Sequence, residues 1–350
     1  MDTFYIIKIL FFTTLAFAFT WAWTPLLTHF LYKYKLGKKI RNNGATPIFS
    51  NLHAAKAGTP TMGGVLVWAT TLFFCILFFY LANFFPESIF AKLNFLSRQE
   101  TLLPLGALVI TALIGLFDDW LDVRGKGVFG GGGLKMKHRL FVYALIALAG
   151  AWWFYFKLDW TVLHIPFWGN YEIGWWYIPF FLFVIIATAF SVNETDGLDG
   201  LAGGTLMMAY ASYGVIAFAL GRYDLATFCG VIMGALLAFL WFNINPARFF
   251  MGDTGAMSLG VTLGVIAMLT NYALLLPIIG VIFVVEALSF LIQVISKKIF
   301  NKKVFLSSPI HHHFQAIGWS EPKIVMRFWV ISGVATVVGL AVFLLDVMTK

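Results

Sequence analysis

Ten long apolar segments separated by polar loops dominate the pattern of this chain. Each is close to the roughly 20 apolar residues that an α-helix needs to cross a bilayer. The apolar stretch over 254–296 is too long for one crossing, and Asn271 and Pro277 mark a turn within it. We therefore predict an all-α polytopic integral membrane protein, a single transmembrane domain over residues 1–350. The ten predicted transmembrane helices cover about 9–32, 62–85, 101–117, 140–156, 175–192, 200–221, 225–244, 254–270, 272–296 and 328–346.

The composition excludes an ordinary soluble domain. Of the 350 residues, 60% are hydrophobic and 11% charged, whereas soluble domains carry about 25% charged residues. The first apolar segment is too long for a signal peptide and lacks a small-residue cleavage pattern, so we expect a retained helix. Cys75 and Cys229 lie inside apolar segments. We expect them to be buried rather than to form a disulfide or a metal site.

Basic residues predict how the chain is oriented in the membrane. Ten crossings leave both termini on one side and five loops on the other, and those loops hold 18 of the 24 Lys and Arg residues. A basic excess marks the cytoplasmic face, so we predict periplasmic termini and an active site on the cytoplasmic face. The net charge of +8 then suits membrane lipids and a phosphorylated substrate, with no nucleic acid. The five loops are about 33–61, 118–139, 193–199, 245–253 and 297–327.

Asp118 and Asp119 follow an uncharged helical segment. They could simply end that helix at the water interface. However, acids oppose the dipole at a helix C-terminus, and two adjacent carboxylates disfavour each other's ionisation. One of them can therefore act as a general base.

Two further loops carry acids and amides. Asn193, Asp196 and Asp199 precede an apolar helix at three-residue spacing, which is more than one helix cap requires. Asn243 and Asp253 bracket the next loop. Asp253 is either a helix cap or a ligand of Mg²⁺, which takes one or two carboxylates plus waters and substrate phosphates.

Histidines and hydroxyls complete the candidate chemistry. Residues 311–313 are consecutive histidines, which suit pyrophosphate contact or proton transfer better than zinc. Thr61 opens a helix whose free N–H groups, with Lys56 nearby, suit a phosphate. Glu286 and Gln293 share one face of an apolar helix, so they point into the bundle, either for a structural hydrogen bond or for function.

The motifs resemble those of the phospho-N-acetylmuramoyl-pentapeptide transferases, within the polyprenyl-phosphate N-acetylhexosamine-1-phosphate transferase superfamily. The resemblance runs from Lys56 to Arg327, and its most specific pieces are Gly58–Gly64, Asn193–Gly200, Phe250–Gly255 and Pro309–Phe314. Two departures are a longer loop over 126–134 and Gln315, where many members have Glu.

The resemblance implies a role for individual residues. The catalytic candidates are Asp118, Asp119, Asp253, His311, His312 and His313, with Asp253 as the Mg²⁺ ligand. The substrate-binding candidates are Lys56, Thr61, Lys137, Asn193, Asp196, Asp199, Asn243, Phe250 and Gln293.

The implied reaction takes place at the bacterial cytoplasmic (inner) membrane. It moves phospho-MurNAc-pentapeptide from UDP-MurNAc-pentapeptide to undecaprenyl phosphate, giving lipid I and UMP in peptidoglycan synthesis. Direct attack, with Asp118 as the proton acceptor, and a covalent phospho-aspartyl route both remain open. A homodimer is also implied.

Three alternative functions remain to be distinguished. A related transferase would use UDP-N-acetylglucosamine. A transporter would place its coupling residues near the bilayer midplane, whereas these acids gather at one interface. A structural scaffold would not need three separate acidic loops.

Overall fold

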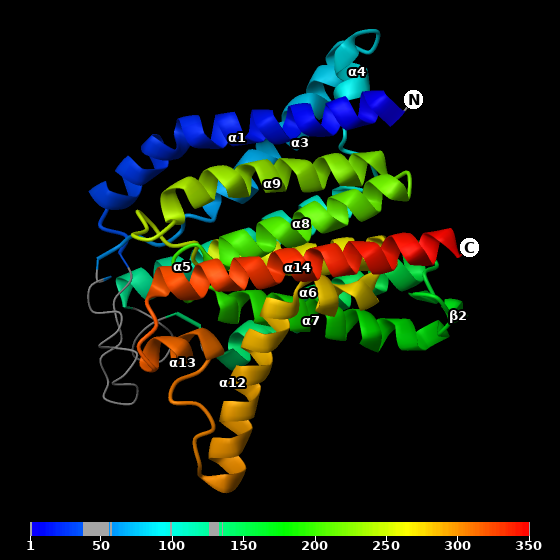
Figure 1. The fold of residues 1–350 in the computed structure, drawn as a ribbon. Helices are drawn as coiled ribbons and strands as arrows, with labels where there is room; N and C mark the ends of the chain where they lie inside the picture. The colour runs from blue at the N-terminus through cyan, green and yellow to red at the C-terminus, as the bar shows by residue number, and fades with distance from the viewer. Residues whose placement is uncertain are drawn as a thin grey trace.

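The fold is a bundle of aligned helices with one small hairpin at an end (Figure 1). It comes from a computed structural model that describes residues 2–37, 56, 58–98, 100–125, 133, 134 and 136–349. The long helices are α1 Asp2–Lys33, α3 Val65–Phe84, α5 Leu102–Arg124, α6 Met136–Lys157, α7 Tyr177–Thr195, α8 Leu201–Ala219, α9 Tyr223–Asn243, α10 Asp253–Leu269, α12 Val281–Phe300 and α14 Glu321–Met348. The short ones are α4 Ile89–Leu93, α11 Leu276–Ile279 and α13 Ile310–Ala316, with 3₁₀ turns at Gly174–Trp176 and Ala273–Leu275.

Every predicted apolar segment contains a helix, which confirms a polytopic helical membrane protein. Among the described residues, eight helices are long and apolar enough to cross a membrane. A ninth candidate is the pair 273–279 and 281–300, which is bent by 82°. The helix α10 has only 17 residues. The count of ten crossings and the orientation therefore stay predictions.

Helix α10 lies at the centre of the bundle. All of its residues are buried, and it packs mainly against α5 and α7. Neighbouring helices rather than lipid surround it, so it need not match the thickness of the hydrocarbon layer by its own length. Its first residue, Asp253, is thereby placed among the ends of those helices.

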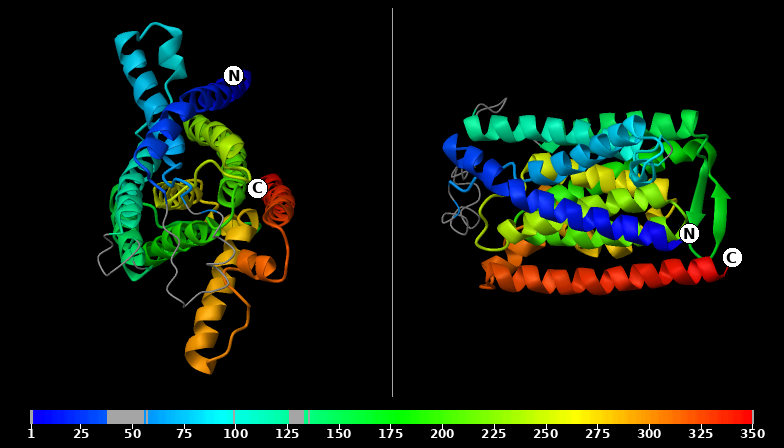
Figure 2. Two further views of the ribbon diagram at one scale, coloured as in Figure 1. Left: turned by 90° about the vertical axis from the view of Figure 1, so that its left-hand side faces the viewer. Right: turned by 90° about the horizontal axis from the view of Figure 1, so that it is seen from above.

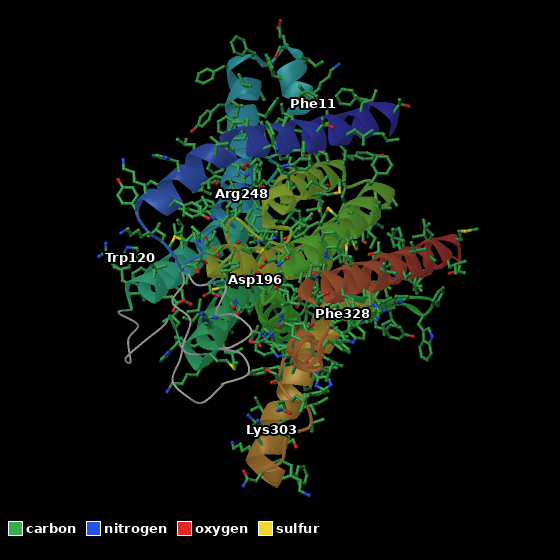
Figure 3. All side chains as sticks on the ribbon, turned by 60° about the vertical axis from the view of Figure 1, so that its left-hand side comes forward. Phe11, Trp120, Asp196, Arg248, Lys303 and Phe328 are labelled. Atoms are coloured by element: carbon green, nitrogen blue, oxygen red, sulfur yellow. The ribbon has the colours of Figure 1, made fainter. Side chains whose placement is uncertain are left out.

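The predicted helix over 272–296 is broken. The chain bends at Gly280, and α12 then projects sideways out of the bundle (Figures 1 and 2). Lys303, just beyond α12, lies far from Asp196 (Figure 3). The outward side chains of α12 include exposed Leu291 and Ile295. Sequence hydropathy could not show the break, because both halves are apolar.

The two described ends of the chain lie at the same end of the bundle (Figures 1 and 2). An even number of crossings requires this arrangement. The antiparallel hairpin of β1 Val162–Ile165 and β2 Gly169–Glu172 lies at this end too. It is a small addition to the predicted all-α fold. Cys75 and Cys229 are free and buried, as predicted.

Several predicted loop residues belong to helices instead. Helix α5 continues to Arg124, so Asp118 and Asp119 lie in its last turns. Asn193 lies in the last turn of α7. Most of the predicted loop at 33–61, and residues 126–132 of the glycine-rich segment, lie outside the described residues.

Candidate active site

Asp119 organises the first turn of α10. Its Oδ1 accepts the backbone N–H of Asp253 at 3.1 Å, and its Oδ2 accepts that of Thr254 at 3.0 Å. The hydroxyl of Thr61 donates to the same carboxylate at 3.3 Å. Gly252 precedes the helix with φ of +75°, and a Cβ there would lie 2.5 Å from Asp119 Oδ2. Asp119 thus satisfies free N–H groups of the helix and fixes the position of Asp253.

Asp118 points into a different network, centred on Arg139. The Arg139 Nε lies 3.0 Å from Asp118 Oδ2, and its second terminal nitrogen lies 2.6 Å from Asp253 Oδ2. The remaining nitrogen donates to Asn193 Oδ1 at 3.1 Å. Asn193 Nδ2 donates in turn to Asp253 Oδ1 at 2.7 Å. One guanidinium therefore joins the ends of α5, α7 and α10 through charge-assisted hydrogen bonds.

The end of the glycine-rich segment also contacts Asp118. The backbone N–H of Leu134 donates to Asp118 Oδ1, and that of Gly133 donates to Asp122 Oδ1 at 3.0 Å. A Cβ at Gly133 would clash with the Asp118 carboxylate. Glycine is required here because the backbone approaches the carboxylate closely.

A second charged cluster surrounds Lys56. Its Nζ donates to Asp199 Oδ1 at 2.7 Å and to Glu321 Oε1 at 2.5 Å. Glu321 also accepts the backbone N–H of Asp199 at 2.6 Å, while Asn245 donates to Asp199 Oδ2 at 2.9 Å. Lys56 lies 5.7 Å from the centre of the Phe250 ring, within cation–π range. These contacts bring the start of α14 to the loops before α3 and α10.

Two predicted substrate residues have structural contacts. The buried Asn243 accepts the N–H of Gly200 at 2.9 Å and donates to the Phe249 carbonyl at 2.8 Å. The buried Gln293 donates to the Phe305 carbonyl at 2.9 Å and accepts the N–H of Val304 at 3.0 Å. Both amides hold loops in place.

The three histidines make three different contacts. His311 Nδ1 lies 2.8 Å from Glu286 Oε2, and both side chains are buried. His312 Nδ1 lies 2.9 Å from Gln315 Oε1, and His313 Nδ1 accepts the N–H of Leu306 at 3.3 Å. The pair on α12 and α13 is an interhelical hydrogen bond, one of the two roles considered for Glu286.

The remaining predicted residues lie at the edges of the site. Asp196 directly follows α7 and is half-buried. Lys137 is exposed in the first turn of α6, and Arg139 enters the cluster instead. Sequence reasoning missed Glu321, which looks like any acidic residue in the first turn of a helix.

An apolar groove lies next to the Arg139 cluster. It has a volume of about 560 Å³ and runs between α6, α7 and the bent pair α11–α12. Its lining includes Met136, three residues before Arg139, and Ser191, two residues before Asn193. Charged helix ends and an apolar channel therefore meet at one place.

The candidate metal ligands at this site are carboxylate oxygens rather than histidine or cysteine side chains. Across the part of the chain that the structure describes, no group of three or more His, Cys, Asp or Glu residues is arranged to hold an ion. The paired carboxylates of Asp118 and Asp253 instead fit Mg²⁺, which takes one or two carboxylates and completes its shell with water and phosphate.

Comparisons with known proteins match this chain to a family of transferases. Residues 101–271 match glycosyl transferase family 4, and residues 56–66 match signature 1 of the phospho-N-acetylmuramoyl-pentapeptide-transferases. A protein from Chloroflexus aggregans named phospho-N-acetylmuramoyl-pentapeptide-transferase is 39% identical over 330 residues, which is 91% of this chain and 84% of that protein. A Geobacillus protein of the same name is 38% identical over 331 residues, which is 93% of this chain and 95% of that protein.

Proposed function

Because the chain belongs to the phospho-N-acetylmuramoyl-pentapeptide-transferase family, we propose that it transfers phospho-MurNAc-pentapeptide from UDP-MurNAc-pentapeptide to undecaprenyl phosphate. The products would be UMP and lipid I, an intermediate of peptidoglycan synthesis at the cytoplasmic membrane. The observation that carries this proposal is the Asp118–Arg139–Asp253 cluster beside an apolar groove. We also expect a homodimer, as the family resemblance implies.

The groove suits the lipid substrate. Its lining side chains are mostly aliphatic or aromatic, such as Phe183, Phe190 and Leu291, and a polyprenyl chain is purely apolar. With its tail in the groove, the lipid would present its phosphate toward Arg139. This placement brings a membrane-embedded nucleophile to a water-soluble substrate without exposing the tail to water.

The Lys56 cluster suits the nucleotide part of the other substrate. Lys56 offers a cation to the diphosphate, and the half-buried ring of Phe250 offers an apolar face to uracil. Glu321 and Asp199 hold Lys56 between them. The ammonium group is therefore positioned before the substrate arrives.

Asp253 would hold Mg²⁺, with the Asp118 carboxylate beside it. When bound, the ion would neutralise the charge that collects on the departing UMP. The chain's own residues would orient the diphosphate, and Arg139 stabilises the carboxylate form of Asp118, which it contacts directly.

The direct route involves one displacement. An oxygen of the lipid phosphate attacks the β-phosphorus of the UDP-sugar, and the P–O bond to the α-phosphate breaks. UMP leaves with the bridging oxygen, and Asp118 accepts the proton of the lipid phosphate when that phosphate is protonated. In the covalent alternative, an aspartate carboxylate first attacks the β-phosphorus and UMP leaves. An oxygen of the lipid phosphate then attacks the same phosphorus and displaces the carboxylate. Isolation of a phospho-sugar enzyme from UDP-MurNAc-pentapeptide alone would overturn the direct route.

A UMP-release assay tests the proposed function. Purified full-length protein is incubated with undecaprenyl phosphate and UDP-MurNAc-pentapeptide, with added Mg²⁺ or with EDTA. We expect UMP only when both substrates and Mg²⁺ are present. Release from UDP-N-acetylglucosamine instead would favour the related transferase, and solute flux through vesicles without UMP release would favour a transporter.

A further inference from the structure

Both carboxylate oxygens of Asp253 are engaged by donors of the protein itself. Asn193 donates to Oδ1 at 2.7 Å, and Arg139 donates to Oδ2 at 2.6 Å. The same guanidinium contacts Asp118 Oδ2 at 3.0 Å. Arg139 therefore bridges Asp118 and Asp253, and Asp253 is the carboxylate that the proposed function assigns to a divalent cation.

Burial makes a positive charge between the two carboxylates favourable. The Asp118 side chain is fully buried, and those of Asp253 and Arg139 are 9% and 21% exposed. Two carboxylates this close would repel each other strongly without a positive charge between them. The charge of Arg139 offsets that repulsion, which is the task a bound metal would also perform.

We propose that Arg139 is an internal counter-cation that competes with the divalent metal for Asp253. Metal entry then requires the guanidinium to withdraw from Asp253 Oδ2, because the two positive charges repel at contact distance. Arg139 has a long, flexible side chain, and a withdrawn guanidinium suits the phosphate oxygens of the arriving substrate. This inference rests on the proposed function.

The alternative is that Arg139 only orients the two aspartates for the metal. The two roles predict opposite changes in metal affinity when Arg139 is replaced. Removing a competitor strengthens metal binding, whereas removing an orienting group weakens it. A measurement of metal affinity without substrate therefore decides between them.

The experiment titrates purified full-length protein with Mn²⁺, used as a paramagnetic substitute for Mg²⁺, and measures free Mn²⁺ by electron paramagnetic resonance. We expect R139Q to bind Mn²⁺ about tenfold more tightly than the unchanged protein. This is the order of effect that one unit charge several ångströms away has on a divalent ion in a water-like dielectric. R139K keeps the charge and should bind Mn²⁺ about as weakly as the unchanged protein.

Arg124 supplies the matched control. It is exposed in the last turn of α5, so R124Q removes the same charge without touching the carboxylate pair. We expect R124Q to shift the affinity much less than R139Q, and D253N to abolish the tight Mn²⁺ site. An R139Q affinity equal to that of R124Q, or weaker than that of the unchanged protein, would overturn the proposal.

Thermal unfolding gives a second measurement that needs no activity. R139Q should unfold at a lower temperature without metal, since no positive charge then lies between the two carboxylates. Mn²⁺ should raise that temperature more than it does in the unchanged protein. If Mn²⁺ raised the unfolding temperature of R139Q no more than that of the unchanged protein, competition would be contradicted. UMP release by the unchanged protein tests the proposed function separately, so the two ideas can fail independently.

Discussion

Adjacent aspartates have different tasks in this protein. Asp119 accepts backbone N–H groups at the start of α10, whereas Asp118 contacts Arg139. The sequence shows the two as an equivalent acidic pair. Their roles differ because successive side chains on a helix point about 100° apart, into different neighbours.

Replacing Asp119 should therefore affect stability more than replacing Asp118. D119A removes an acceptor for two N–H groups of α10, which should cost about 1–2 kcal/mol, as the loss of a helix cap does. It should also displace Asp253 and reduce UMP release. The melting temperature of the purified variant, compared with that of D118N, measures the difference. Equal melting temperatures would contradict a capping role for Asp119.

Asp253 should be required for metal-dependent turnover. D253N keeps the size of the side chain and an acceptor for Asn193 or Arg139, so the protein should remain folded. UMP release should fall by roughly 100-fold or more, as losses of electrostatic groups in active sites commonly do. Near-normal Mg²⁺-dependent release from a folded variant would refute the metal assignment.

Glu321 should position Lys56 for the nucleotide substrate. E321Q weakens the 2.5 Å contact with Lys56, so we expect a several-fold higher KM for UDP-MurNAc-pentapeptide and little change in kcat. Glu87 is exposed between α3 and α4, and E87Q is the matched control with unchanged kinetics. A lower kcat at unchanged KM would instead assign Glu321 to the chemical step.

At the scale of elements, the bend at Gly280 creates the apolar groove. Helix α12 leaves the bundle at 82° to the preceding helix, so its first turns line a channel with α7 instead of packing flat against it. One straight helix over 272–296 would have run along the bundle. The apolar groove thus depends on a break in the helix that the hydropathy pattern cannot reveal.

Filling the groove should reduce the use of the lipid substrate specifically. Ala187 lines the groove on α7, and A187W would occupy part of its 560 Å³. The KM for undecaprenyl phosphate should rise several-fold, while the KM for UDP-MurNAc-pentapeptide stays unchanged. V337W, on an exposed position of α14, is the control for adding an indole to the apolar surface. Equal effects of both variants would contradict a lipid groove.

At the scale of the whole molecule, the helix ends that carry the site gather opposite the two termini (Figure 1). The excess of Lys and Arg predicts that this end faces the cytoplasm. Both natural cysteines are buried, so a cysteine introduced at the surface would be the one accessible to a water-soluble reagent.

Labelling with a membrane-impermeant maleimide tests the orientation. A cysteine in place of Ser308, in the loop before α13, should react only in inside-out vesicles. A cysteine in place of the exposed Glu172, in the hairpin at the other end, should react in intact spheroplasts. The reverse pattern would overturn the predicted orientation.

Hydropathy and local motifs alone determined where the helices lie and which polar residues stand at their ends. All ten apolar segments contain helices, and Asp118, Asn193, Asp199 and Asp253 lie in or near the terminal turns of helices. These properties are local, since a helix and its length depend on neighbouring residues.

Only the tertiary structure decided which charged groups meet. Arg139 rather than Lys137 enters the site because the helical phase of α6 turns one inward and leaves the other exposed. Lys56 meets Glu321 across 265 residues of sequence, and α12 bends where its apolar pattern is continuous. Such pairings depend on how helices pack and cross, and the order of residues along the chain carries no record of that geometry.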